Sequence, residues 1–268
     1  MLLIKEEVHM APRFLADYPG SRLASLRSER LAILPLGSIE YHGPHGALGT
    51  DLFIAEELAR RVGDALDALI LPAVPFTHCP PPTRSYHGTF DIAEETAARY
   101  FHDVVAGCLR LGVRGVLILN AHDANTRPAQ TAVDRLSESY PDQFVLFVNW
   151  WEAMLLPIIE PLGLFSQVGG HGHGSPLEIS AAEAARPGTA DLAAARDIDM
   201  VESPGAGIVR ALHEGRSIPN WAGHHGLASE ASLEKGQRVL ELAADRITAL
   251  TSEWLTELEQ DRGSSMDT

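Results

Sequence analysis

The sequence predicts an α/β fold of one domain, in which helices cover both faces of a mostly parallel sheet. Short apolar runs alternate with amphipathic helical stretches along the chain, and this alternation is typical of parallel strands joined by crossover helices. The length of 268 residues and the 45% hydrophobic content are sufficient for one such core. We expect the domain to span residues 1–262 and a disordered polar tail to occupy 263–268.

The first part of the chain contains three predicted strands and two predicted helices. The strands are Leu31–Leu36, Ala68–Val74 and Gly115–Leu119, and the helices are Asp51–Leu66 and Ala93–Leu111. The first helix has apolar residues at helical spacing, and Asp51 stands where an N-cap is expected. A proline-rich loop at Cys79–Pro82 follows the second strand.

The second part continues the alternation and adds two loop regions. The predicted elements are a helix at Thr126–Ser137, a strand at Phe144–Val148, and helices at Leu177–Ala185 and Leu233–Leu258. The stretches 162–174 and 203–226 are rich in glycine, histidine and proline, and we interpret them as loops around a pocket. Such Rossmann-like layering places ligands at the carboxyl ends of the strands.

Composition excludes several classes of function. The formal net charge of -15, with no basic run, excludes a nucleic-acid partner, because phosphates would not be neutralised. Two cysteines do not make a disulfide framework, and Cys108 has the setting of a small core residue. The apolar start of the chain is too short for a signal-peptide core, and no later run reaches the length of a membrane span. We therefore expect a cytoplasmic protein with no membrane partner.

The richest segment in chemical groups is 37–51, directly after the first predicted strand. Glu40 and His42 are two residues apart, so an extended backbone projects both side chains to one side, and His45 and Asp51 follow. Oxygen and imidazole ligands without a thiolate suit Zn, Mn, Fe or Co, and this set excludes a soft, cysteine-based site. The alternative is a polar loop in which Asp51 only caps a helix and Glu40 is solvated.

Two later segments carry further candidates. His122 follows the clearest strand, and Asn120 and Asn125 can brace its loop through side-chain hydrogen bonds. His173 lies between glycines, five residues before Glu178. A loop carrying an acid/base histidine over a metal site is the functional interpretation, and an incidental histidine in a mobile loop is the alternative.

These motifs resemble those of the creatininase family of amidohydrolases over residues 30–240. The family signature Gly-Ser-x-Glu-x-His-Gly-Pro-His, followed by Gly-Thr-Asp, is matched by Gly37, Ser38, Glu40, His42, Gly43, Pro44, His45, Gly49, Thr50 and Asp51. Less specific motifs are matched by Asn120, His122 and Asn125, by His173, Glu178 and Ser180, by Gly88–Thr89, and by Glu234–Gly236.

The resemblance implies one or two divalent ions per chain, of Zn, Mn or Fe. Glu40 and His122 would hold one ion, His42 would hold the other, and Asp51 would bridge both. It also implies a small-molecule substrate and a homo-oligomer, often a hexamer.

The chain departs from the family pattern at the second ion. A glutamate ligand found in creatininase two positions after the equivalent of His122 is replaced here by Ala124. Glu178 or Asp123 is expected to replace it, or else the second ion binds weakly. An acidic residue often found before the equivalent of His173 is Gly172 here, so the substrate is not predicted to be creatinine in particular.

The predicted reaction is hydrolysis of a non-peptide C–N bond in a cyclic amide, lactam or formamide by a metal-activated water. His173 is the expected general acid, with Glu178 as a metal ligand or proton shuttle. Trp150, Trp151 and Trp221 either line a pocket for a flat substrate or pack in the core.

Two rival functions remain open from the sequence. The same site could run toward ring closure or dehydration in a biosynthetic pathway. Alternatively, the chain could be a metal-binding relative without turnover, because the site and not the fold decides function. A metal phosphatase is disfavoured, because no arginine or lysine lies within the three loops to clamp a phosphate.

Overall fold

A computed structural model describes residues 13–27, 31–154, 159–166, 172–198 and 221–265. At its centre lies a four-stranded sheet with the strand order β2-β1-β3-β4, and every pairing is parallel. The strands are β1 (Leu31–Leu36), β2 (Leu69–Ile70), β3 (Gly115–Asn120) and β4 (Val145–Asn149). The predicted parallel sheet is therefore confirmed.

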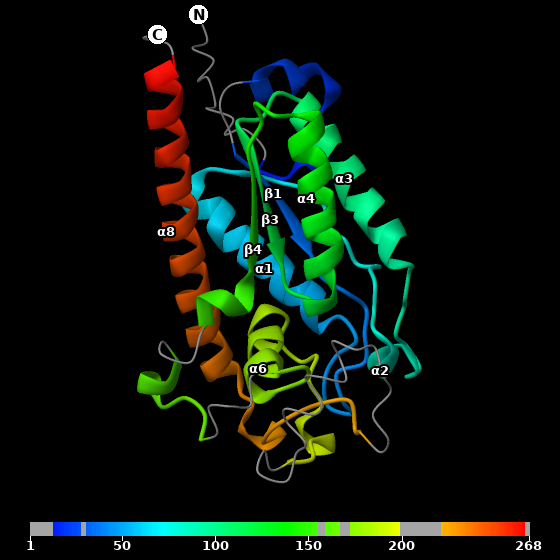
Figure 1. Cartoon of the computed structure of the whole chain (residues 1–268). Coiled ribbons are helices and arrows are strands. Elements are labelled where there is room, and N and C mark those ends of the chain that lie inside the picture. Colours follow the sequence, from blue (N-terminus) through cyan, green and yellow to red (C-terminus); the bar gives the residue numbers. More distant parts are fainter. Residues whose placement is uncertain (1–12, 28–30, 155–158, 167–171, 199–220, 266–268) are drawn as a thin grey trace, which may run out of the picture.

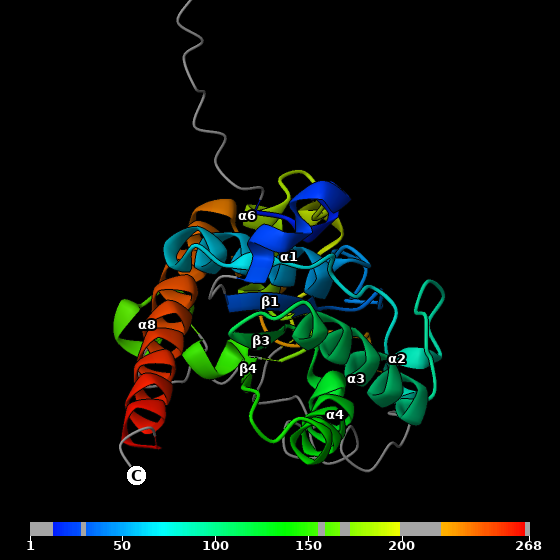
Figure 2. The ribbon, with the colours of Figure 1, turned by 90° about the horizontal axis from the view of Figure 1, so that it is seen from above.

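Helices cover both faces of this sheet, as predicted (Figures 1 and 2). On one face lie α1 (Thr50–Leu66) and α8 (Leu233–Ser265), with α6 (Pro176–Ala185) packed against both. On the other face lie α3 (Glu94–Arg110) and α4 (Thr126–Ser139). The shorter elements are η1 (Leu15–Asp17), η2 (Gly20–Arg27), α2 (Pro81–Arg84), η3 (Asp123–Asn125), η4 (Trp150–Met154), η5 (Glu160–Leu162), η6 (Leu192–Ala194) and η7 (Ala228–Glu230).

The two central strands, β1 and β3, are buried at every position. Ile33 and Leu117 point into the core beneath α1 and α8, whereas Leu34 and Ile118 point into the core beneath α3 and α4. Because both faces of the sheet are covered, these strands are continuous apolar runs and show no alternation of polar and apolar residues.

The predicted strand at Ala68–Val74 is shorter in the structure, where β2 contains only Leu69 and Ile70. Pro72 has no N–H group to donate, and proline is tolerated only at an edge such as this one. The chain nevertheless stays beside β1, because the amide of Val74 donates to the carbonyl of Pro35 at 3.0 Å.

Helix α1 begins one residue earlier than predicted, and this changes the role of one predicted site residue. Its N-cap is Gly49, and Asp51 lies inside the first helical turn. The interpretation of Asp51 as the N-cap is therefore wrong. The residue is 1% exposed, and its carboxylate accepts a hydrogen bond from Ser38, which lies just beyond the end of β1.

The last helix, α8, runs to Ser265, beyond the predicted end at Leu258. It crosses α6 closely at Gly236, where an added Cβ would lie 1.7 Å from the carbonyl oxygen of Ser180. Within the described part of the chain, none of the helices is long and apolar enough to cross a membrane.

The ends of three strands lie level with one another. Leu36 of β1 pairs with Asn120 of β3, and Asn120 pairs with Asn149 of β4. The loops that follow these strands therefore leave the sheet at one edge, which faces α2 and α6 in the lower half of Figure 1. This edge is where the predicted site residues gather.

Candidate metal centre

Four of the predicted ligands come from three segments and meet at the carboxyl edge of the sheet. Glu40 and His42 lie in the loop after β1, Asp51 lies in the first turn of α1, and His122 follows β3. All four side chains are buried, with relative exposures between 0% and 5%. Buried charged groups of this kind require partners, because burial alone is costly.

Asp51 lies between the two imidazoles. Its Oδ1 is 3.0 Å from Nε2 of His42, and its Oδ2 is 3.0 Å from Nδ1 of His122. Ser38 donates its hydroxyl hydrogen to Oδ2 at 2.7 Å. Each carboxylate oxygen of Asp51 therefore faces a different histidine, which is the arrangement of a carboxylate that can bridge two cations.

Glu40 completes the half of the centre around His122. Its Oε2 is 2.9 Å from Nδ1 of His122. The other ring nitrogen of His122, Nε2, donates to the carbonyl of His78 at 2.9 Å. This backbone contact leaves Nδ1 as the ligand atom, as is usual for metal-binding histidines.

Glu178 lies in the other half, beside His42. Its Oε2 is 3.8 Å from Nε2 of His42 and accepts a hydrogen bond from the amide of Gly174 at 2.7 Å. Asp123, the other residue expected to replace the missing glutamate, is exposed at the start of η3. Of these two carboxylates, Glu178 is the one placed to serve the second ion.

The electrostatics of the centre favour positive charge between the carboxylates. Burial acts to lower the pKa of His42, but the Asp51 carboxylate outweighs it and the pKa is raised to about 10. The same two effects act on His122. Burial acts to lower its pKa, but the charge of Glu40 outweighs burial and holds the pKa well above its ordinary value. Burial acts to raise the pKa of Glu40, but the positive charge of His122 lowers it to about 2.

These residues fit a divalent cation. Two buried carboxylates and two imidazoles form a hard-to-borderline donor set, which suits Zn, Mn or Fe. In the ion-free protein, protons on the two imidazoles supply the positive charge that a cation would supply in their place. Separate groups of potential ligands lie on the two sides of Asp51.

The loops of the centre are braced by asparagines at the strand ends. Asn120 donates to the carbonyl of His122 and to Oδ1 of Asn149, both at 2.8 Å. Asn125 donates to the carbonyl of Gly37 at 3.0 Å. This network joins the loops after β1, β3 and β4, as predicted for Asn120 and Asn125, and holds the backbone that carries His122.

His173 lies over the half that contains His42, and the two rings stack with their centroids 4.1 Å apart. Its Nε2 donates to the carbonyl of Tyr41 at 2.6 Å, so Nδ1 is free and lies 3.5 Å from Oε1 of Glu40. Burial and the positive charge of His42 lower the pKa of His173 to about 4. The other histidine of this loop, His171, lies outside the described residues.

An aromatic wall lies beyond His173. Trp221 lies 5.6 Å from His173 and 5.3 Å from His225 between ring centroids, and Tyr86 stacks on Tyr41 at 4.4 Å. The structure thus puts Trp221 near the centre, whereas Trp150 is a core residue. His224 and His225 were predicted to be incidental, because no carboxylate lies at ligand spacing from them in the sequence, yet His225 lies beside Trp221 in this wall.

Cys79 is a further residue near the centre that the sequence analysis did not predict to be there. The sequence excluded a cysteine-based site, yet the Sγ of Cys79 lies 3.9 Å from Oε2 of Glu40. No signal in the sequence places residue 79 near residue 40, because the contact depends on how the loop after β2 folds back over the sheet edge.

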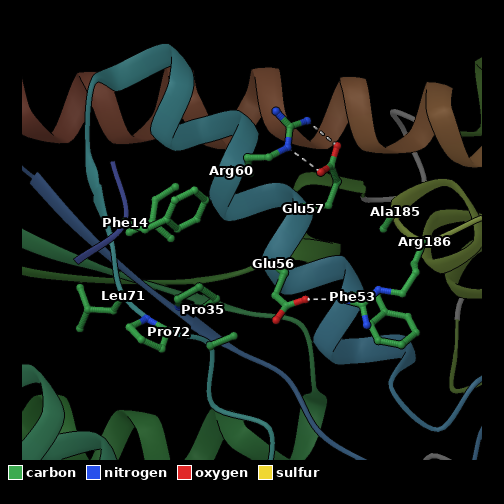
Figure 3. A pocket seen from close by; sticks show the side chains of 12 residues that line it. Phe14, Pro35, Phe53, Glu56, Glu57, Arg60, Leu71, Pro72, Ala185 and Arg186 are labelled. Carbon is green, nitrogen blue, oxygen red and sulfur yellow. Dashed lines mark hydrogen bonds and ion pairs between the residues drawn. The ribbon is translucent and has the colours of Figure 1, made fainter. Parts of the chain in front are cut away.

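A separate hollow of about 340 Å³ lies between α1 and the β2 edge (Figure 3). Its charged side chains are already paired, since Arg186 contacts Glu56 at 2.9 Å and Arg60 contacts Glu57 at 2.8 Å. None of its lining residues belongs to the carboxylate–histidine cluster. The potential metal ligands therefore lie in the cluster and not in this hollow.

Comparison with known proteins agrees with this geometry. The sequence profile of Creatininase, described as creatinine amidohydrolase, matches residues 20–251. The chain belongs to the creatininase family. It is 24% identical over 226 residues to the creatinine amidohydrolase of Pseudomonas putida, across 80% of this chain and 86% of that protein. A 3-dehydro-scyllo-inosose hydrolase of Thermotoga maritima is 25% identical over 125 residues, across 46% of this chain and 40% of that protein.

Solved creatininase structures share the fold. A crystal structure of creatinine amidohydrolase superposes with a TM-score of 0.74 at 22% identity, covering 91% of this chain and 98% of that one. A mutant creatininase of the Zn–Zn type superposes with a TM-score of 0.74 at 21% identity, and a Mn form with a TM-score of 0.73 at 22% identity. Each match also covers 91% of this chain and 98% of the other chain. The creatininase-like fold predicted from the sequence motifs is thus confirmed.

Proposed function

We propose that this creatininase-family chain is a metal-dependent hydrolase that cleaves a non-peptide C–N bond in a small molecule, such as a cyclic amide, a lactam or a formamide. The observation that carries the proposal is the position of Asp51, whose two carboxylate oxygens face His42 and His122 on opposite sides. The amidohydrolase name of the P. putida relative supports the class of bond.

The two halves of the centre divide the ligands. Glu40 and His122 would hold one ion, His42 and Glu178 would hold the other, and Asp51 would offer one carboxylate oxygen to each half. The Zn and Mn forms of the related structures support these metals here. Bound divalent ions lower the pKa of a water from about 15.7 to near 7 and so supply a nucleophile at neutral pH.

His173 moves the proton in this scheme. Its lowered pKa keeps the ring neutral at pH 7, and the hydrogen bond from Nε2 to the Tyr41 carbonyl leaves Nδ1 as the accepting atom. Nδ1 takes the proton released when the nucleophile attacks the carbonyl carbon, and then gives it to the departing nitrogen as the C–N bond breaks. The aromatic wall of Trp221 and Tyr86 offers flat surfaces to a planar substrate.

The test combines metal analysis with a substrate panel. Purified protein should contain one or two divalent ions per chain, lose activity on chelation, and regain it with Zn²⁺ or Mn²⁺. The panel starts with creatinine and 3-dehydro-scyllo-inosose, the compounds named for the curated relatives, and continues through lactams and formamides. No bound ion and no activation by added metal would overturn the proposal.

Each lactam is assayed together with its opened amino acid. Turnover only toward ring closure would favour the biosynthetic alternative over hydrolysis, because both reactions use the same centre. A bound ion without turnover of any compound in either direction would favour the non-catalytic alternative.

A homo-oligomeric, hexameric assembly and a cytoplasmic location stay predictions. Light scattering of the purified protein tests the first, and fractionation of the source cells tests the second.

A further inference from the structure

Cys79 lies in the loop after β2, and its side chain is fully buried. Its amide donates to Oδ1 of Asp91 at 2.9 Å, and the preceding carbonyl, of His78, accepts from Nε2 of His122 at 2.9 Å. Residue 79 is therefore anchored on one side to the loop that carries Asp91 and on the other to the ring of a proposed metal ligand. Its Sγ has little freedom to leave the centre.

Sγ lies close to the half of the centre that contains Glu40 and His122. It is 3.9 Å from Oε2 of Glu40, the oxygen that also faces Nδ1 of His122. It is also 3.9 Å from Nε2 of His122, the ring nitrogen that donates to the His78 carbonyl and is not the ligand atom. One ligand atom from each of these three residues lies within 4.8 Å of those of the other two. Metal bonds of about 2.0–2.3 Å separate the ligands of a tetrahedral ion by about 3.3–3.8 Å, so the sulfur needs only a small shift to join.

A purely structural role would explain why the thiol of Cys79 is buried, but not why it lies beside Glu40 and His122. Sγ donates to the carbonyl of Phe90 at 3.3 Å, which satisfies one hydrogen bond of a small buried side chain. That contact alone does not require a thiol directed at Glu40 and His122. Cys108 shows the purely structural case, because it is buried in α3 among apolar side chains of the core.

We propose that Cys79 is a ligand of the ion held by Glu40 and His122, and that it makes this half of the centre selective for thiophilic ions such as Zn²⁺ over Mn²⁺. The inference rests on the proposed function, since it concerns the same metal centre. Coordination replaces the Sγ–H bond by a bond from Sγ to the ion and releases one proton to solvent. Thiolate is the softest protein ligand and prefers Zn²⁺ or Co²⁺ to Mn²⁺.

The first experiment loads ion-free protein with Co²⁺ alone and records its absorption spectrum. We expect a thiolate-to-cobalt charge-transfer band in the near ultraviolet for the wild type and for the control Cys108→Ser, and no such band for Cys79→Ser. Visible ligand-field bands without the charge-transfer band in the wild type would overturn the inference but leave the proposed function intact. No cobalt binding at all would instead count against the proposed function.

The second experiment measures competition between Zn²⁺ and Mn²⁺ for the ion-free protein. Cys79→Ser should lower the preference for Zn²⁺ by at least about tenfold, whereas Cys108→Ser should leave it unchanged. An unchanged preference in Cys79→Ser would overturn the inference. If Cys79→Ser does not fold, X-ray absorption at the zinc edge of the wild type decides, because one sulfur neighbour is expected and none would refute the ligand.

Discussion

The two halves of the metal centre share Asp51 but are built differently. Around His122, the ligand contacts are 2.9 and 3.0 Å, and the side chains of Glu40 and His122 are at most 5% exposed. Around His42, Asp51 also lies at 3.0 Å, but the second carboxylate, of Glu178, lies 3.8 Å away and its side chain is 16% exposed. The first half stands on loops braced at the strand ends, whereas Glu178 is carried by α6 outside the sheet.

This difference indicates which half of the centre has its ligands in place before an ion binds. The loops after β1 and β3 leave a rigid sheet, so Glu40 and His122 meet whether or not an ion is present. The half around His42 depends on the packing of α6 against α8 and on the loop that carries His173. We expect the first half to bind its ion tightly and the second half to differ in affinity with small changes of packing.

The largest expected effect comes from removing the residue that both halves share. Asp51→Asn keeps the size of the side chain but removes the charge between the two imidazoles. Loss of activity should exceed about 100-fold, the upper effect of changing only an outer-shell partner, and metal analysis should show both ions depleted. Asp123→Asn is the matched control, because Asp123 is exposed and directly follows His122. Retention of both ions in Asp51→Asn would refute the bridging role.

The next effect separates the halves. Glu40→Gln should weaken the tighter ion by about 100-fold, and Glu178→Gln should weaken only the other ion, by about tenfold. Titration calorimetry of the ion-free variants measures both sites. Equal losses in the two variants, or loss of the tight ion in Glu178→Gln, would show that the two halves do not bind their ions independently.

The pH dependence of stability should also differ between the ion-free and ion-loaded protein. The folded pKa of His42 is raised from 6.5 to about 10, so its stabilising contribution is complete below pH 6.5 and is lost as the pH rises through 10. Glu178, whose pKa burial raises to about 8, adds a loss of stability in the same direction above its ordinary value of 4.5.

The Tm of the ion-free protein should therefore fall by at least about 5 °C between pH 6.5 and 10. In the loaded protein, cations replace the protons, so the fall should be much smaller. Differential scanning calorimetry across this range measures both curves. Parallel curves for the two forms would show that the histidines do not carry the charge proposed for them.

The smallest effect tests whether α6 controls the second half. Gly236→Ala places a Cβ against the carbonyl of Ser180 and should cost about 1–3 kcal/mol of unfolding free energy. Because α6 must shift, the ion at Glu178 should weaken more than the ion at Glu40. Denaturant unfolding and metal titration measure the two effects. Gly20→Ala is the control, since nothing lies within 4 Å of its added Cβ. An equal loss of ion affinity in this control would show that the packing of α6 does not control the second half.

Much of the fold was predictable because its signals are local. The buried strands β1 and β3 are uninterrupted apolar runs, and α1, α3 and α4 have amphipathic patterns within a few residues of their observed bounds. The errors arose where local signals compete. Pro72 ended β2 early, and Gly49 capped α1 in place of Asp51.

The centre was predictable to the same extent. Glu40, His42 and Asp51 lie within twelve residues and form one dense motif, and His122 follows a clear strand. The choice of Glu178 over Asp123 was not predictable, because it depends on where α6 docks. The position of Cys79 was unpredictable for the same reason, and the sequence left Trp221 open between a pocket and the core, since each reaches the centre through a long-range contact.

The sequence by itself determined a parallel α/β sheet and a carboxylate–histidine donor set at its carboxyl edge, because strand periodicity and short motifs are encoded by neighbouring residues. The tertiary structure alone decided that the two oxygens of Asp51 face opposite imidazoles and that the thiol of Cys79 lies 3.9 Å from Oε2 of Glu40. Those features are distances between side chains from separate loops, and only the packing of the whole chain sets such distances.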